Sequence, residues 1–218
     1  MSTNQSRTAP PSLSVVIPVY NEEQWIVRSV GAIVAAARHA EWPVEVIVVD
    51  DGSTDGTAAS LAKLAAEHGI TVISQPNMGR FDARRNGMAK ASGEMLMLLD
   101  SRVIVAETAL SFLRDQLVDH PERKVWNGHV DIASKGNPYA AFMAAMVKIP
   151  WRRYCANPRL MSYGIEDFDV YPKGTTYFCA PKALFEEAAT AFESLYDDVK
   201  LSSDDTKLLR WVAEPPAS

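Results

Sequence analysis

Residues 46–57 read VIVVDDGSTDGT, and this stretch decides the fold class. A run of β-branched residues leads into two carboxylates and a glycine-containing turn, and an Ala- and Leu-rich helical segment follows. Such an apolar run is typical of a strand buried on both faces of a parallel sheet. Asp50 and Asp51 then stand at the carboxyl end of the strand, where open α/β sheets bind ligands.

A simpler interpretation makes Asp51, Ser53 or Asp55 the cap of the following helix. Capping accounts for one acidic residue, but not for three acidic residues beside two glycines. The stretch therefore favours a ligand-binding site at the edge of a parallel sheet.

The segments around this stretch alternate between strand and helix patterns. Apolar runs predict strands at 13–19, 44–49, 70–74 and 94–99, and amphipathic runs predict helices at 21–39, 57–68 and 80–91. Asn21 is the expected cap of the first helix. Alternation at this short spacing predicts an α/β fold with a mostly parallel central sheet flanked by helices.

The second half of the chain is less regular. We expect a helix at 107–119, a strand at 124–133, an irregular stretch at 134–176, a strand at 175–180, a helix from Pro181 and a last helix near Asp204. We therefore predict a disordered tail at 1–12 and a single domain at 13–218. Its regular half (13–105) is expected to bind a nucleotide, and residues 106–218 are expected to shape a second pocket.

Composition narrows the kind of partner. The 218 residues carry a net charge of -5, which argues against nucleic acid as the main partner. Arginines cluster locally at positions 80, 84 and 85 and at 152 and 153, a pattern that suits a small phosphorylated ligand.

Cysteine usage and hydropathy point to a cytoplasmic protein. The two cysteines, Cys155 and Cys179, are too few for a disulfide scaffold, so we expect two reduced thiols. No segment approaches the roughly 20 apolar residues that span a bilayer. Peripheral association with a membrane surface stays open, and the sequence says nothing about the oligomeric state.

Three predicted strands end in polar residues: YNE at 20–22, DD at 50–51 and DSR at 100–102. Because the carboxyl ends of parallel strands meet at one edge of a sheet, these groups should converge. The chain lacks a Walker-type phosphate loop and a dinucleotide-binding glycine fingerprint. We therefore expect a nucleotide site built largely from side chains and strand-end backbone.

Several blocks of the sequence resemble inverting, family-two-type glycosyltransferases with the GT-A fold. These blocks are IPVYNEE, VVDDGSTDGT and QPNMGRFDARRNGMAKASGEMLMLLD, in the order and spacing of that family, followed by weaker matches in GTTYFCAPKALFEEA and SSDDTKLLRW. The resemblance implies a transferase that moves a sugar from a UDP- or GDP-sugar to an acceptor hydroxyl with inversion, in the synthesis of a cell-surface polysaccharide or glycoconjugate. Residues 13–105 would hold the donor and 106–218 the acceptor. Family members commonly continue beyond the last block, so a truncated domain is an open alternative.

The resemblance also implies roles for the donor-side residues. Pro18 and Tyr20 would flank the base, with Tyr20 stacking or packing on it, and Glu22 would lie near the base or ribose. Asp51 would accept a hydrogen bond from a ring N–H of the base, with Asp50 supporting it.

The third block and the fourth strand end supply the remaining donor-side positions. Arg80, Asp82 and Arg84 would lie in the segment that closes over the ribose and diphosphate, where arginine suits phosphate. Asp100 and Ser101 would also belong to the nucleotide-sugar site. Arg85 is better explained as solvated helix surface.

One departure concerns the metal. The family usually ends the fourth strand with Asp-x-Asp, whose last carboxylate binds Mg²⁺ or Mn²⁺, but Arg102 stands in that place and cannot ligate a cation. Either Arg102 itself neutralises the leaving diphosphate, which we favour, or Asp100 holds a metal together with groups such as Glu166, Asp167 or Asp169.

Inverting transfer needs a carboxylate to take the proton from the acceptor hydroxyl. By register with the family's acidic pair, Asp205 would be the base and Asp204 its neighbour, although Ser203 or Asp204 would also serve as a helix cap. Aromatic residues of the irregular stretch would line the acceptor site or simply pack: Trp151, Tyr154, Tyr163, Phe168 and Tyr171.

Two rival functions remain. A nucleotide-sugar-binding protein or subunit without transferase activity would explain the degenerate metal motif. A nucleotidyltransferase on a similar sheet is disfavoured because the Gly-rich activation loop of those enzymes is missing.

Overall fold

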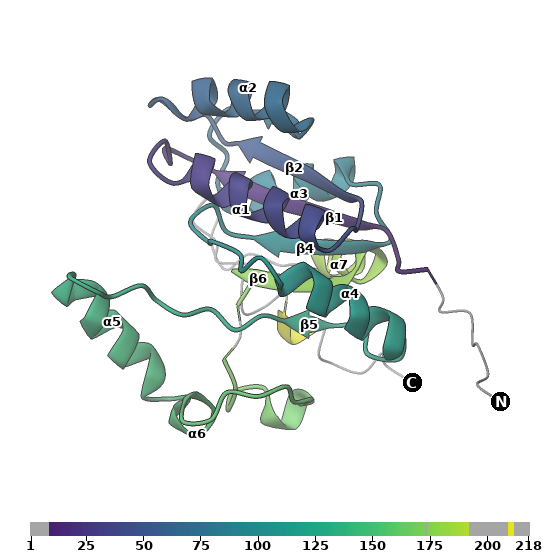
Figure 1. Ribbon diagram of the computed structural model, residues 1–218, viewed down its shortest axis with the longest axis vertical. Helices are drawn as coiled ribbons and strands as arrows, with labels where there is room; N and C mark the ends of the chain where they lie inside the picture. Colours follow the sequence, from purple (N-terminus) through teal and green to yellow (C-terminus); the bar gives the residue numbers. More distant parts are fainter. Residues whose placement is uncertain (1–8, 173, 192–208, 212–218) are drawn as a thin grey trace.

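The computed structural model describes residues 9–172, 174–191 and 209–211. Its core is a six-stranded sheet in the order β3-β2-β1-β4-β6-β5 (Figure 1). The strands are β1 (Leu13–Val19), β2 (Val44–Asp50), β3 (Thr71–Ser74), β4 (Met95–Leu99), β5 (Trp126–Asn127) and β6 (Tyr177–Pro181). Strands β1 to β4 pair in parallel, whereas β6 runs antiparallel to both β4 and β5. The predicted α/β fold with a mostly parallel sheet is confirmed.

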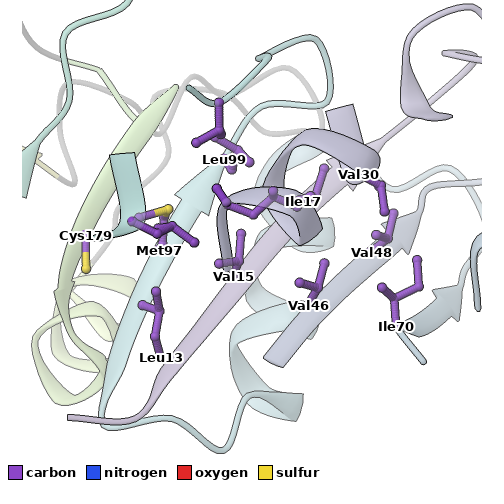
Figure 2. Close-up of a cluster of buried hydrophobic side chains, with 14 of the residues drawn as sticks. Leu13, Val15, Ile17, Val30, Val46, Val48, Ile70, Met97, Leu99 and Cys179 are labelled. Atoms are coloured by element: carbon purple, nitrogen blue, oxygen red, sulfur yellow. The ribbon is translucent and has the colours of Figure 1, made fainter. Parts of the chain in front are cut away.

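Helices cover both faces of this sheet. One face carries α1 (Ile26–His39), α2 (Thr57–His68) and α4 (Ala109–Asp119), and the other carries α3 (Arg80–Lys90) and α7 (Lys182–Thr190). Residues of β1 alternate between the two cores: Val15 and Ile17 pack toward α1, and Val16 packs toward α3. Figure 2 shows the first core, where strand residues of β1, β2 and β4 gather under Val30 of α1.

Close packing on the second face depends on a glycine. A Cβ added at Gly87 of α3 would lie 2.4 Å from Cγ1 of Val16 and 3.1 Å from Cγ2 of Val49. A side chain at this position would therefore push α3 away from the sheet, so glycine lets the helix lie against β1 and β2.

The regular half agrees closely with the prediction from sequence, and Gly69 ends α2 in the left-handed conformation, with a φ of 68°. At the start of the domain, the Ser12 amide donates a hydrogen bond to the Glu94 carboxylate, and the Trp42 indole N–H donates one to the Pro11 carbonyl. This end of the predicted tail is thus hydrogen-bonded to the domain, and residues 1–8 lie outside the described part.

Two predictions for the second half are wrong. The strand expected at 124–133 is reduced to β5, and the stretch expected to be irregular contains α5 (Pro138–Lys148), α6 (Arg152–Cys155) and a short 3₁₀ turn, η1 (Ile165–Asp167). Helix α5 forms because Asn137 accepts a hydrogen bond from the Ala140 amide, Pro138 occupies the first turn, and alanines and methionines follow.

The expected cap of α1 is also wrong. The helix begins at Ile26, with Trp25 at its N-cap position, whereas Asn21 has a positive φ of 54° and belongs to the preceding loop. Both cysteines are free, as predicted, and burial raises the pKa of the Cys179 thiol to about 12.

Candidate functional site

The polar strand ends converge on one cleft of about 2240 Å³ at the carboxyl edge of the sheet. The cleft is lined by residues at the end of β1, by residues that directly follow β2 and β4, by the start of α3, and by residues from the second half of the chain. The lining includes most of the predicted donor residues: Pro18, Tyr20, Glu22, Asp51, Arg80, Asp100, Ser101 and Arg102. Asp82 and Arg84 are buried and are not among the lining residues.

Hydrogen bonds tie the loop after β1 to the loop after β2. The Asn21 amide donates to Ser53 Oγ at 3.0 Å, and the Glu22 amide donates to Thr57 Oγ1 at 2.8 Å. In the other direction, the Thr54 amide donates to Asn21 Oδ1 at 2.7 Å. This set of contacts between residues 21–23 and 53–57 is called the loop clasp below.

The clasp explains much of the Gly-Ser-Thr-Asp-Gly turn. Asp55 accepts hydrogen bonds from the amides of Glu23 and Thr57, and the hydrogen bond from the Thr57 side chain is the main reason that the pKa of Asp55 lies below its usual value. Gly56 donates to Glu23 Oε2 at 2.7 Å, and a Cβ there would lie 2.6 Å from that oxygen. Asp55 is therefore a structural residue of the clasp.

Asp51 joins the ends of β2 and β3 to the start of α3. Its side chain is buried, and it accepts hydrogen bonds of 2.8 Å from Gln75 Nε2 and from the amides of Met78 and Gly79. These two amides precede α3, so the carboxylate also lies near the positive end of that helix. Asp51 does not cap α2, the simpler role considered from sequence. Asn86 extends the network, because its amide donates to Gln75 Oε1 at 2.7 Å.

Asp50 has a local role. Its Oδ1 accepts a hydrogen bond of 3.0 Å from the Ser53 amide, and its side chain is buried. Asp50 therefore shapes the turn that follows β2, next to Asp51.

A buried arginine supports Asp100. Arg84 Nη2 lies 2.9 Å from Asp100 Oδ1; the arginine side chain is 1% exposed and the aspartate side chain 31%. The pair is asymmetric: Arg84 belongs to the core beneath α3, and Asp100 reaches the cleft. Arg84 thus contacts the site through Asp100.

Arg102 crosses to the end of β1. Its Nε donates to Glu22 Oε1 at 2.7 Å, and its side chain is 69% exposed and lines the cleft, whereas the side chain of Glu22 is 10% exposed. The loop clasp fixes the backbone of Glu22, and the Glu22 carboxylate in turn orients Arg102. The guanidinium of Arg102 therefore stands at the position where the family that this chain resembles usually has a metal-binding carboxylate.

The remaining residues of α3 divide between surface and interior. Arg80 is exposed at the first turn and lines the cleft. Asp82 pairs with Arg85 at 2.7 Å, one turn along the same helix, and Arg85 also lies over the Phe81 ring. The largely exposed Arg85 fits the expected helix surface.

Aromatic rings from the second half of the chain also line the cleft. Tyr163 and Tyr171 lie 5.0 Å apart between ring centroids, Tyr171 and Tyr154 6.5 Å, and Tyr154 and His129 5.5 Å. All four residues line the cleft. Phe168 also reaches it but is 2% exposed and packs in the core, whereas Trp151 lines a separate small pocket.

The residues described here do not form a metal site. Within the described ranges, no group of three His, Cys, Asp or Glu side chains lies close enough to hold a cation. Asp100 is paired with Arg84, Arg102 cannot ligate, and Asp169 is paired with Arg210 at 3.0 Å. Glu166 and Asp167 are exposed and are not among the cleft residues. Asp204 and Asp205 lie outside the described residues, so the predicted base stays a prediction.

Sequence reasoning missed Gln75 and Thr57. Gln75 directly follows β3 and is therefore a fourth polar strand end, a signal that was present in the sequence. The role of Thr57 depends on a contact with Glu22 across 35 positions, which no local pattern reveals.

The mostly parallel sheet with a polar cleft at these strand ends is that of the GT-A fold of glycosyltransferases, as the family model and the structural matches below show. The chain belongs to glycosyl transferase family 2, whose family model matches residues 14–190.

Its curated relatives include undecaprenyl-phosphate 4-deoxy-4-formamido-L-arabinose transferases. The one from Pectobacterium carotovorum is 39% identical over 93 residues, which are 41% of this chain and 28% of the relative. The one from Serratia proteamaculans is 37% identical over 100 residues, 44% of this chain and 31% of the relative. The matched part thus spans less than a third of these relatives.

Solved structures support the fold. TarS 1-349 from S. aureus matches with a TM-score of 0.68 and 19% identity, over 93% of this chain and 55% of that chain. The mannosyltransferase PcManGT from Pyrobaculum calidifontis, in complex with GDP-Man and Mn²⁺, matches with a TM-score of 0.57 and 21% identity, over 83% of this chain and 47% of that chain.

Proposed function

We propose that this protein transfers a sugar from a UDP- or GDP-sugar to an acceptor oxygen, with inversion at the anomeric carbon. The observation that carries the proposal is the convergence of three polar strand ends on one cleft, with the cationic side chain of Arg102 exposed in it. Aromatic side chains line the same cleft and would border the acceptor.

The base of the donor lies against β1 and β2 in this proposal. Tyr20 is 46% exposed and can stack on the base beside Pro18. Asp51 Oδ2 accepts one hydrogen bond from the protein, and a carboxylate oxygen has room for a second, from a ring N–H of the base.

The diphosphate then lies at the end of β4. As the bond from the anomeric carbon to the diphosphate oxygen breaks, its electron pair stays on the diphosphate and negative charge grows there. Arg102 supplies a fixed cation at that point, and Arg80 a second one at the mouth of the cleft. Because the described residues do not fit a divalent cation, no step is assigned to a metal.

The proton of the acceptor hydroxyl goes to the Asp205 carboxylate. The acceptor oxygen attacks the anomeric carbon from the face opposite the diphosphate, so the configuration inverts. The names of the curated relatives make a polyprenyl phosphate an acceptor to test beside simple hydroxyl acceptors. A phosphate oxygen is already deprotonated near neutral pH and would need no base.

Replacing Arg102 by alanine should weaken nucleoside diphosphate binding about tenfold, because one charge-assisted contact is lost. Stability should fall by about 1–2 kcal/mol, because Arg102 is 69% exposed but the Glu22 carboxylate, which is 10% exposed, loses its charge partner. Isothermal titration with UDP and with GDP, each in EDTA and in Mn²⁺, measures the effect. Arg102→Lys is the control and should retain most of the affinity. Strict Mn²⁺ dependence with equal affinity in Arg102→Ala would contradict the proposed role.

Replacing Asp205 by asparagine should slow sugar transfer to a hydroxyl acceptor about 100-fold, because the general base is lost. The affinity for UDP or GDP should stay within about twofold, since this residue is not assigned to the donor. Release of free nucleoside diphosphate in the presence of acceptor gives the rate, and Asp204→Asn is the neighbouring control. An unchanged rate in Asp205→Asn would remove it from the mechanism.

A second candidate is a nucleotide-sugar-binding protein without transferase activity. The pairing of Asp100 with Arg84 favours it, since the carboxylate left from the metal motif is already neutralised. The two functions separate in one assay: both bind the donor, but only the enzyme releases nucleoside diphosphate in step with glycosylated acceptor.

A further inference from the structure

Helix α5 presents its large side chains to solvent. Tyr139, Phe142, Met146 and Ile149 are 72%, 60%, 47% and 57% exposed, and Met143 is 37% exposed. Ile149 is the C-cap residue of α5 and has helical backbone angles, so the spacing places all five on one side of the helix, within an arc of about 120°. This set of five residues is called the outer face of α5 below.

The opposite side of α5 carries small residues. Ala140 and Ala144 are the less exposed positions of this helix, and they line the cleft and the small neighbouring pocket respectively. A helix that packs on a core normally does the reverse and buries its large apolar residues. Figure 1 shows α5 and α6 standing clear of the layers around the sheet, so the described elements leave the outer face uncovered.

The charge of this segment is the opposite of the charge of the chain. Residues 132–165 contain five lysines and arginines and no Asp or Glu, whereas the whole protein has a net charge of -5. The five cations are exposed and lie just before α5, at its last residue or after it: Lys135, Lys148, Arg152, Arg153 and Arg159. Lys148 has Asp131 at 4.0 Å, in an exposed pair that contributes little.

We propose that the outer face of α5, with the cations beside it, docks the protein on an anionic lipid bilayer. Exposed aromatic and aliphatic side chains beside a lysine- and arginine-rich stretch are the features of helices that lie in a membrane interface. Tyr139 suits the headgroup level, where tyrosine is enriched. No described helix has the length and hydropathy to cross a bilayer. In this proposal α5, with 11 residues, lies in the membrane surface.

Docking through α5 would place the cleft next to the membrane. Ala140, on the inner side of α5, lines the same cleft as Arg102, so the docked helix forms part of the route between the bilayer and the site. The inference itself rests on α5 and its neighbours and does not depend on the reaction assigned to the cleft.

Co-sedimentation of the full chain with vesicles tests the proposal. Vesicles of phosphatidylcholine with about 30% phosphatidylglycerol should bind the protein more tightly than phosphatidylcholine alone, and raising NaCl from about 50 to about 500 mM should weaken that binding. The triple variant Phe142→Ser, Met146→Ser, Ile149→Ser should lose at least about tenfold in binding. Val27→Ser, at an exposed apolar position of α1, is the apolar control and should bind like the wild type.

A variant that removes charge tests the electrostatic part of the proposal separately from the apolar part. Arg152→Gln with Arg153→Gln should weaken binding to phosphatidylglycerol-containing vesicles about tenfold. The matched control, Lys63→Gln with Lys90→Gln, removes the same charge from exposed positions of α2 and α3 and should leave binding unchanged.

Three outcomes would overturn the proposal. The first is vesicle binding that is absent in the wild type or equal in the triple variant. The second is a wild type that self-associates in analytical ultracentrifugation and a triple variant that is monomeric, which would assign the outer face to a second copy of the chain. The third is a lower Tm in the triple variant, which would show that other residues of the same chain cover that face.

Discussion

Replacing Arg84 by methionine is expected to lower the free energy of unfolding by about 3–5 kcal/mol, the usual effect of removing one partner of a buried ion pair. Arg84 is 1% exposed, and its guanidinium neutralises Asp100 at 2.9 Å. Because Asp100 is 31% exposed, water can solvate part of its charge, and we expect the lower end of the range. Urea denaturation followed by circular dichroism measures the change.

Arg85→Met is the matched control for this variant. It removes the same charge from the next position of α3, where the side chain is 56% exposed and its partner Asp82 is 11% exposed, and should cost about 1–2 kcal/mol, less than Arg84→Met. Equal stability of the two variants would show that the Arg84–Asp100 pair does not hold α3 to β4. Arg84→Met should also weaken UDP or GDP binding, because Asp100 would then carry an unpaired negative charge next to the diphosphate.

Replacing Asp51 by alanine is expected to cost about 3 kcal/mol, because buried donors that lose their acceptor are expensive. The amides of Met78 and Gly79 and the side chain of Gln75 would all lose a partner. The segment before α3 would lose its fixed position, and Arg80 at the start of α3 would no longer be held in the cleft. The affinity for UDP or GDP should therefore fall at least about tenfold. Urea denaturation and isothermal titration measure the two effects.

Asp51→Asn separates the two roles of this residue. The asparagine side chain keeps one oxygen that can accept a hydrogen bond, but its NH₂ group now faces one of the donors that Asp51 satisfied. The loss of unfolding free energy should therefore be about half of the loss in Asp51→Ala. If Asp51→Ala unfolds like the wild type, the three hydrogen bonds do not organise this edge of the sheet. If stability falls and nucleotide affinity does not, Asp51 is a structural residue alone.

The regular half of the chain was predictable because each element repeats a simple local pattern. The run VIVV before Asp50 is buried in the structure, and Gly69 ends α2 in the conformation that only glycine adopts readily. The convergence of Glu22, Asp51 and Arg102 followed from topology, since parallel strands bring their carboxyl ends to one edge. Family membership then accounts for the order of the blocks.

The rest was not predictable from local pattern. Helix α5 is the exception, because its local signals were present: Asn137 stands before Pro138, and alanines and methionines follow. What the local pattern did not show is that its large apolar residues point outward. Arg84 was expected at the phosphates because arginine suits phosphate, but its depth in the fold depends on how α3 packs against β4. Pairs such as Arg102 and Glu22, 80 positions apart, are set by tertiary structure alone.

The loop clasp has a consequence for the kinetics and thermodynamics of donor capture. Ordering a loop upon association reduces affinity and slows docking, because conformational freedom is lost at that moment. Here residues 21–23 and 53–57 are already bound to each other before any nucleotide arrives. The two loops that border the nucleotide site are therefore ordered in advance. Little of the binding free energy is lost to ordering their backbone when the nucleotide binds.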